Sequence, residues 1–175
     1  DDHPDTKVYM HNLMLDLFGI LPVEQKKEND NSTNSFYNRT TLVHWMKHIG
    51  VEKNSALDAD VPEIVFRAGR AFAKAFVRGL FTADGTVTKE GYASLSSVSE
   101  SLIDHTQQLL LSLGIPSGKS IKPERYDRYG DHPVYVLRII TERGLKTFAK
   151  DIGFLAEKKN MRLKTCCEFE TNDII

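Results

Sequence analysis

The chain has 175 residues, a length that suits one domain or two small subdomains. Its 41% hydrophobic and 27% charged residues fit a folded globular protein and exclude an extensively disordered one. Lys and Arg total 23 and Asp and Glu total 24, so the net charge of -1 excludes a strongly basic protein that coats nucleic acid without specificity, although a local basic face stays open.

Membrane and secretory features are not visible in the sequence. No stretch reaches the roughly 18 apolar residues that span a membrane, and the N-terminal residues do not read as a signal peptide. The two cysteines, Cys166 and Cys167, are adjacent, and neighbouring cysteines rarely form an unstrained disulfide. We therefore expect a protein of a reducing compartment, the cytoplasm, with no membrane partner.

The first part of the chain predicts two helices around a hairpin. The expected elements are a helix over 10–18, a strand over 20–23, a polar loop or hairpin tip over 24–34, a short returning strand over 35–38 and an amphipathic helix over 41–49. Glycines stop both helices, at positions 19 and 50. The inward face of the second helix is expected to carry Leu42, Trp45, Met46 and Ile49.

The second part begins after a polar linker over 52–60. A helical segment over 62–84, broken near Gly69, is followed by Gly85, which we expect to leave the helix with a positive φ. The later expected elements are a strand over 92–98, a helix over 99–113 capped by Ser99, paired strands over 119–122 and 134–140, and a helix over 141–152. Residues 157–175 stay unassigned.

A repeat links the two parts. The sequence around Gly19 recurs around Gly114, 95 positions later, and the sequence around Gly50 recurs around Gly153, 103 positions later. Each copy runs helix, strand, polar loop, strand, helix. The elements that precede the second copy would fall before residue 1 in the first copy, so the chain is expected to start part-way through a repeat.

Two stripes mark the segment 71–85. Phe72, Phe76 and Leu80 form an apolar stripe, and Ala71, Ala75, Gly79 and Ala83 form a stripe of small residues that lets a second helix come close. Asp84 ends this face. Two such carboxylates from paired helices would bind a divalent metal and activate water against a phosphodiester. The alternative is that the small stripe packs on the protein's own sheet and Asp84 only begins an Asp-Gly turn.

The run Val-Arg-Gly-Leu-Phe-Thr-Ala-Asp-Gly at 77–85 resembles the signature of the LAGLIDADG homing endonucleases, most of all those within inteins. Pro62-Glu63 before it, and Ser96-Ser97 and Leu113-Gly114-Ile115 after it, fit the same family. The resemblance covers about 10–163 and implies an α+β fold of αββαββα units with saddle-shaped antiparallel sheets. It divides the chain into a partial first repeat without its motif helix, plus linker (1–60), a complete repeat (61–163) and a tail (164–175).

The resemblance also implies the site. Asp84 would bind Mg²⁺ with Gly85 beside it, and Lys158 or Lys159 would take the place of a catalytic lysine. The motif-helix interface would use Ala71, Ala75, Gly79 and Ala83. Double-stranded DNA would lie on polar side chains of strands and loops, for which the candidates are Lys89, Tyr92, Ser94, Ser96, Lys119, Lys122, Arg125, Arg128 and Arg138. For Arg125 and Arg128, a solvated surface loop is the equal alternative.

Departures from the family pattern leave three functions open. Thr82 stands where the family's motif has its first Asp, at a position expected to tolerate change. The chain also lacks the first of the family's two motif copies, the lysine before Pro62 and the splicing motifs of an intein. We expect an intein-associated homing endonuclease domain that hydrolyses DNA at a long specific site. The alternatives are a DNA-binding or structural remnant and an RNA-splicing helper. One Asp84 per chain is half a site, so cutting both strands needs a homodimer through the motif helix or an N-terminal segment.

Overall fold

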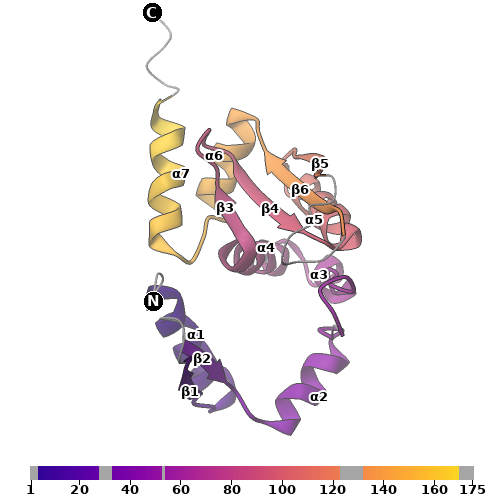
Figure 1. The fold of residues 1–175 in the computed structure, drawn as a ribbon, viewed down its shortest axis with the longest axis vertical. Coiled ribbons are helices and arrows are strands. Elements are labelled where there is room, and N and C mark those ends of the chain that lie inside the picture. Colours follow the sequence, from indigo (N-terminus) through magenta and orange to yellow (C-terminus); the bar gives the residue numbers. More distant parts are fainter. Residues whose placement is uncertain (1–3, 28–32, 53, 123–131, 170–175) are drawn as a thin grey trace, which may run out of the picture. The chain divides into compact units, whose positions relative to one another are not determined.

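The structure is a computed structural model, and it describes residues 4–27, 33–52, 54–122 and 132–169. The chain divides into two compact units, 1–51 and 52–175, which are described separately (Figure 1). Among the described residues, no helix is both long enough and apolar enough to cross a membrane.

The first unit is a hairpin flanked by two helices. Its elements are α1 (Pro4–Phe18), β1 (Val23–Lys26), β2 (Thr33–Phe36) and α2 (Thr40–His48), and the two strands pair antiparallel. The strand predicted over 20–23 begins only at Val23, because Ile20 is buried with Met14 and Leu42 and Pro22 has no N–H to donate. Trp45 was predicted to face inward, but it is 45% exposed and packs beside Phe18.

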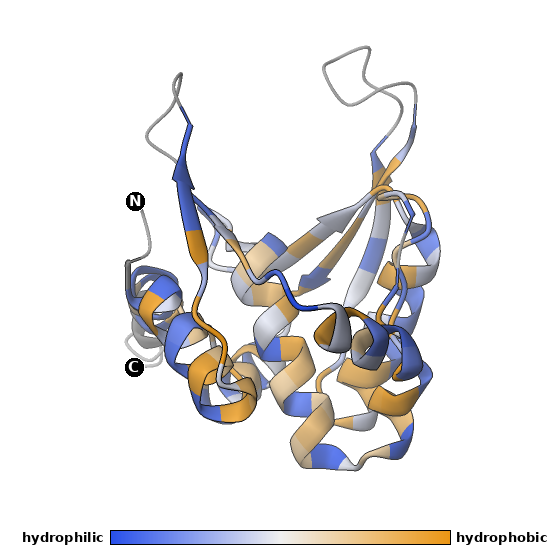
Figure 2. Cartoon of the chain, turned by 90° about the horizontal axis from the view of Figure 1, so that it is seen from below, coloured by the Kyte–Doolittle hydropathy of each residue, from blue (hydrophilic) through white to orange (hydrophobic). Residues whose placement is uncertain are grey.

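The second unit joins helices to one antiparallel sheet. Its elements are α3 (Glu63–Arg67), α4 (Arg70–Asp84), β3 (Gly85–Val87), β4 (Ala93–Ser97), α5 (Glu100–Ser112), β5 (Gly118–Lys122), β6 (Val134–Ile139), α6 (Glu142–Asp151) and α7 (Glu157–Phe169). The strand order is β3-β4-β6-β5. Figure 2 shows the helices of this unit on one side of its sheet. Strand residues Leu95 and Leu137 share one buried cluster with helix residues Phe81, Ile103 and Phe148, so this side of the sheet is the core.

Two glycines and two caps set the helix boundaries of this unit. Gly69, at φ 89°, separates α3 from α4 as predicted. The prediction for Gly85 was wrong, since its φ is -83°. Glycine is needed there for space instead, because a Cβ would lie 2.5 Å from the carbonyl oxygen of Phe81. The side chains of Ser99 and Thr141 cap α5 and α6 by accepting backbone N–H bonds.

The repeat predicted from the sequence is visible in the element order. The first unit runs α1-β1-β2-α2, and the second unit contains the same order in α5-β5-β6-α6. In the second unit this half is preceded by α4, β3 and β4, which complete the sheet. The expected tail boundary after residue 163 falls inside α7, whose Leu163 is buried in the core.

Candidate active site and nucleic-acid interface

Helix α4 presents a buried face and an uncovered face. Ala73, Val77 and Phe81 are buried in the core of the second unit. The small-residue stripe, by contrast, is exposed along its length, at Ala71, Ala75, Gly79 and Ala83. A Cβ built at Gly79 meets no atom within 4 Å. The stripe therefore does not pack on the protein's own sheet, and its surface is open to a second helix.

Asp84 is the last residue of α4, and its side chain is exposed. Strand β3 begins at the next residue, so the carboxylate lies where the motif helix turns into the sheet. Of the two lysines predicted for this site, the structure brings Lys159 to it, because the Lys159 Nζ donates to the carbonyl oxygens of Thr82 (2.6 Å) and Gly85 (2.7 Å). Lys158, on the same helix α7, is exposed.

The environment of Lys159 is unusual for a lysine. Burial lowers the pKa of its amine below the usual value, and the negative charge of Asp84 acts in the opposite direction. The amine also lies 5.8 Å from the centre of the Phe154 ring. A cation held by fixed backbone acceptors beside a carboxylate is suited to stabilise charge that develops on a phosphate.

The oxygen atoms at the end of α4 are of the type that binds a hard divalent cation, but they are few. A carboxylate oxygen of Asp84 and the carbonyl oxygen of Gly85 are the ligand types that Mg²⁺ takes, although the carbonyl already accepts from Lys159. Within the described ranges, no group of three or more His, Cys, Asp or Glu residues could hold a metal ion. Asp84 is one carboxylate, and further ligands would have to come from water, phosphate or a second carboxylate.

The face of the sheet opposite the core carries polar side chains together with Gly118 and the buried Val136. Strand pairing aligns Thr86, Ser94, Arg138 and Gly118 in one row, and Ser96, Val136 and Ser120 in the next. Arg138 is half-buried between the core residues Leu137 and Ile139 and points away from them, as predicted. Thr86 and Ser120 were missed, because only the register of the strands places Thr86 beside Ser94 and puts Ser120 in the row of Ser96, on the far side of Val136. Lys122, at the end of β5, follows Ser120 on this face and is exposed.

The remaining DNA candidates are dispersed. Lys89 is exposed in the turn between β3 and β4, and Ser96 is exposed on β4, whereas Ser94 is 4% exposed. Tyr92 is half-buried against the core cluster. Arg125 and Arg128 lie outside the described residues.

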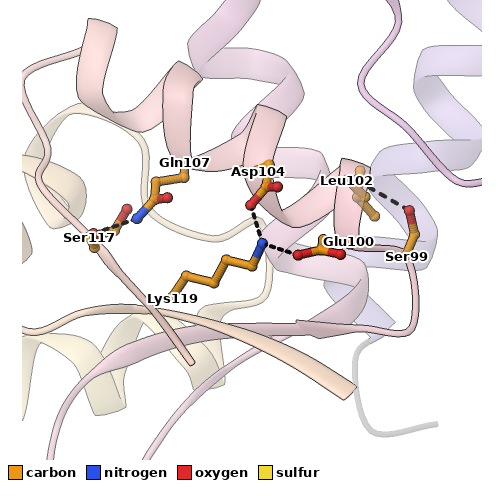
Figure 3. A network of polar contacts seen from close by, with 7 residues as sticks. All are labelled: Ser99, Glu100, Leu102, Asp104, Gln107, Ser117 and Lys119. Carbon is orange, nitrogen blue, oxygen red and sulfur yellow. Dashed lines mark hydrogen bonds and ion pairs between the residues drawn. The ribbon is translucent and has the colours of Figure 1, made fainter. Parts of the chain in front are cut away.

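Lys119 lies on the other side of the sheet, in register with the core residue Leu137. Its Nζ pairs with Glu100 (2.7 Å) and Asp104 (2.5 Å) of α5 (Figure 3). The same Nζ lies 5.2 Å from the centre of the Tyr135 ring. The hydrogen bonds that Lys119 donates to Asp104 and Glu100 raise the pKa of Lys119, and the bond from Lys119 lowers the pKa of Glu100. This lysine ties the edge strand to a helix, and we leave it out of the polar face.

Known proteins resemble the chain in both sequence and fold. Residues 71–153 match the family described as LAGLIDADG-like domain. A variant of the homing endonuclease I-DmoI, in complex with its target DNA in the presence of Mg, has a TM-score of 0.56 at 16% identity, over 83% of this chain and 70% of that chain. Mesophilic variants of I-DmoI give a TM-score of 0.60 at 17% identity, over 84% and 73%. At these identities the likeness shows the fold, which is that of the LAGLIDADG homing endonucleases, as predicted.

Relatives in sequence have diverse names. A DNA polymerase of Thermococcus hydrothermalis is 34% identical over 131 residues, which are 70% of this chain and 8% of that protein. The replication factor C small subunit of Methanocaldococcus jannaschii is 24% identical over 84% of this chain and 8% of its own length. The ribonucleoside-diphosphate reductase NrdEB subunit alpha of Bacillus subtilis is 28% identical over 65% and 10%. The chain thus spans about a tenth or less of each of these relatives.

Proposed function

Because residues 71–153 belong to the LAGLIDADG family and the chain has the fold of its homing endonucleases, we propose that it is the endonuclease domain of an intein and hydrolyses DNA phosphodiesters with a divalent metal ion. The named relatives support the intein origin. A polymerase, a replication factor and a reductase have different names and roles, yet each contains a segment like this one within 8–10% of its length. Such a distribution is typical of an element inserted into unrelated host proteins.

The observation that carries the enzymatic proposal is that Lys159 is bonded to the backbone on both sides of Asp84, at Thr82 and Gly85. The carboxylate is exposed at the end of the motif helix, and the lysine amine is fixed beside it on two backbone carbonyls. In related structures the homing endonuclease I-DmoI is bound to DNA with Mn or Ca. Here Asp84 and the Gly85 carbonyl would hold Mg²⁺, and the bound ion would supply a more acidic water and a counter-charge for phosphate. Lys159 would add positive charge at the same end of the helix.

Double-stranded DNA is the proposed partner of the polar sheet face. Arg138 lies in the middle of that face, with Ser94 and Gly118 directly opposite on the two neighbouring strands. Arginine is the side chain that most often recognises guanine in the major groove. Lys89 and Lys122, both exposed, would add phosphate contacts.

Half a catalytic site per chain requires a second half. The exposed stripe of Ala71, Ala75, Gly79 and Ala83 would receive the motif helix of a second copy or of another segment, and a second carboxylate would then adjoin Asp84. Light scattering behind size exclusion, with and without Mg²⁺, measures which arrangement exists. A dimer that Ala75→Glu dissociates supports pairing of two α4 helices, whereas a monomer restricts the chain to single-strand nicking.

The test of the enzymatic proposal uses a randomised double-stranded DNA library incubated with Mg²⁺, followed by sequencing of new ends. We expect wild-type protein to produce ends at one long preferred sequence and Asp84→Asn to lower the cleavage rate about 100-fold or more, because the neutral amide loses the metal-binding charge. Asp58→Asn, a matched change of an exposed carboxylate outside the site, should cleave like the wild type. Cleavage by Asp84→Asn at the wild-type rate would reject Asp84 as the ligand.

A second candidate function is a DNA-binding remnant that has lost cleavage. It is favoured by the single carboxylate at the end of α4 and by the uncovered stripe, since both describe an incomplete site among the described residues. In the same library, a remnant would enrich a bound sequence without producing ends, and Asp84→Asn would not change its behaviour. Competition with an RNA library separates either function from RNA binding.

A further inference from the structure

We propose that Thr82 and Asn160 are positioning residues that dock the segment 152–160 against the end of α4 and thereby hold the Lys159 amine beside Asp84. The catalytic part of this inference rests on the proposed nuclease function, whereas the docking itself is a property of the fold. Thr82 is the motif residue that departs from the family pattern.

Thr82 uses its hydroxyl twice. The side chain is 7% exposed, and its Oγ1 donates to the carbonyl oxygen of Arg78 at 2.6 Å, the common bond of a helical threonine to the residue four positions earlier. The same oxygen accepts the backbone N–H of Leu155 at 2.8 Å, from a segment 73 residues away in sequence. A hydroxyl can donate and accept at once, and valine, which has nearly the same shape, can do neither. A position that is buried and bonded in this way is not the tolerant one expected from the sequence.

Asn160 closes the docked segment on itself. Its Oδ1 accepts the N–H of Phe154 at 2.8 Å, and its Nδ2 donates to the carbonyl oxygen of Phe154 at 2.5 Å. Gly153 fits this closure, because a Cβ there would lie 3.1 Å from the Asn160 Oδ1 and its φ is +62°. Arg78 adds a third tie, with its Nε donating to the carbonyl oxygen of Ile152 at 2.5 Å. The first turn of α7 is therefore fixed next to the last turn of α4.

This docking determines where Lys159 can reach. A lysine side chain has four rotatable bonds, and it loses much rotamer freedom when its amine is held in one place. Lys159 meets its two carbonyl acceptors only if the backbone of α7 is held at the right distance, and its acceptor Thr82 O belongs to the residue whose hydroxyl holds Leu155. Thr82 thus contacts both Leu155 and the Lys159 amine. A small displacement of a catalytic group lowers the reaction rate strongly.

The first experiment measures docking without enzyme activity. Amide hydrogen exchange by NMR should show a protected Leu155 N–H in the full chain, and Thr82→Val should lower that protection about tenfold or more, as expected for loss of one buried hydrogen bond. Thr82→Ser should retain it. Thr147→Val is the matched control, since the Thr147 hydroxyl also donates to the carbonyl four residues earlier but from α6. Unchanged protection of Leu155 in Thr82→Val overturns the docking role.

The second experiment measures positioning. On the DNA site recovered from the library, Thr82→Val should slow single-turnover cleavage about tenfold with unchanged DNA affinity, and Thr82→Ser should restore the rate. In a Lys159→Met background, Thr82→Val should cause no additional loss, and a full additional loss would overturn action through Lys159.

If the wild type cleaves nothing, the proposed function fails. Positioning is then decided by the ¹H–¹⁵N signal of the Lys159 ammonium group, which should be visible in the wild type and lost in Thr82→Val, and a signal that persists in the variant overturns it.

Discussion

The two units of the chain repeat one order of elements, and they differ in what that order buries. In the second unit, α5-β5-β6-α6 packs with α4, β3 and β4, and Phe81 and Phe148 lose all solvent exposure. In the first unit, α1-β1-β2-α2 buries Met14, Ile20 and Leu42 among its described residues, while Leu17 is 64% exposed. The motif helix α4 and the hairpin of β3 and β4 are thus the parts of the repeat that create its core.

The physical reason is the ratio of surface to volume. Four short elements can enclose few side chains, and below about 40–60 residues a chain buries too little apolar surface to balance its conformational entropy. The second unit adds the helices α3, α4 and α7 and the strands β3 and β4, and these convert the exposed side of the half repeat into an interior. The residues of the proposed function follow the same division, because Asp84, Lys159 and Arg138 all belong to the second unit.

The largest expected effect separates the two units by their stability. Phe81→Ala removes a fully buried ring that contacts Phe148 and Phe154, and it should destabilise the second unit by about 3–5 kcal/mol. Trp45 is the single tryptophan and lies in the first unit, so its fluorescence reports that unit while far-UV circular dichroism reports mainly the second. In urea, the fluorescence transition should come first and stay in place in Phe81→Ala, and the dichroism transition should shift. A single coincident transition in both proteins would contradict the comparison.

A smaller effect compares Gly79, on the exposed stripe of α4, with Gly85, directly after the end of α4. Gly85→Ala should destabilise by about 1–3 kcal/mol, because the new Cβ meets the Phe81 carbonyl oxygen at 2.5 Å. Gly79→Ala is the control, and it should stabilise the helix by up to about 1 kcal/mol, because its Cβ enters open space. Urea denaturation followed by circular dichroism measures both changes, and equal effects would show that the stripe and the turn are not distinct environments.

The smallest effect concerns Lys119 and pH. The folded pKa of Glu100 lies below its usual 4.5, so this stabilisation is present above that value and is lost as the pH falls through the folded pKa. The folded pKa of Lys119 lies above its usual 10.5, so its contribution is present below that value and is lost at higher pH. The wild type should therefore melt at a higher temperature than Lys119→Met, and this difference should be constant between about pH 5 and 10. The difference should be small, as is typical of exposed ion pairs. Lys122→Met, on the same strand, should show no such difference.

Local patterns predicted most elements of the second unit, because each is determined by neighbours in sequence. Ser99 was recognisable as a cap, Gly69 as a break, and the strands around 119–122 and 134–140 as a pair. The weaker predictions fall where tertiary packing decides. Trp45 follows a helical stripe, but the small buried cluster of Met14, Ile20 and Leu42 in the first unit does not enclose it. Lys119 alternates as a surface residue would, yet the strand register turns it toward α5.

The sequence by itself determined the resemblance to the LAGLIDADG family, the motif helix with its small-residue stripe, and the choice of Asp84 as the candidate metal ligand, because these depend on residue types at fixed spacing along one helix. Only the tertiary structure decided which lysine accompanies that carboxylate, that the stripe is uncovered, and that Thr82 joins α4 to a segment 73 residues away. Those features depend on how distant segments pack, and the distance between two atoms of different elements is not encoded in the spacing of either element alone.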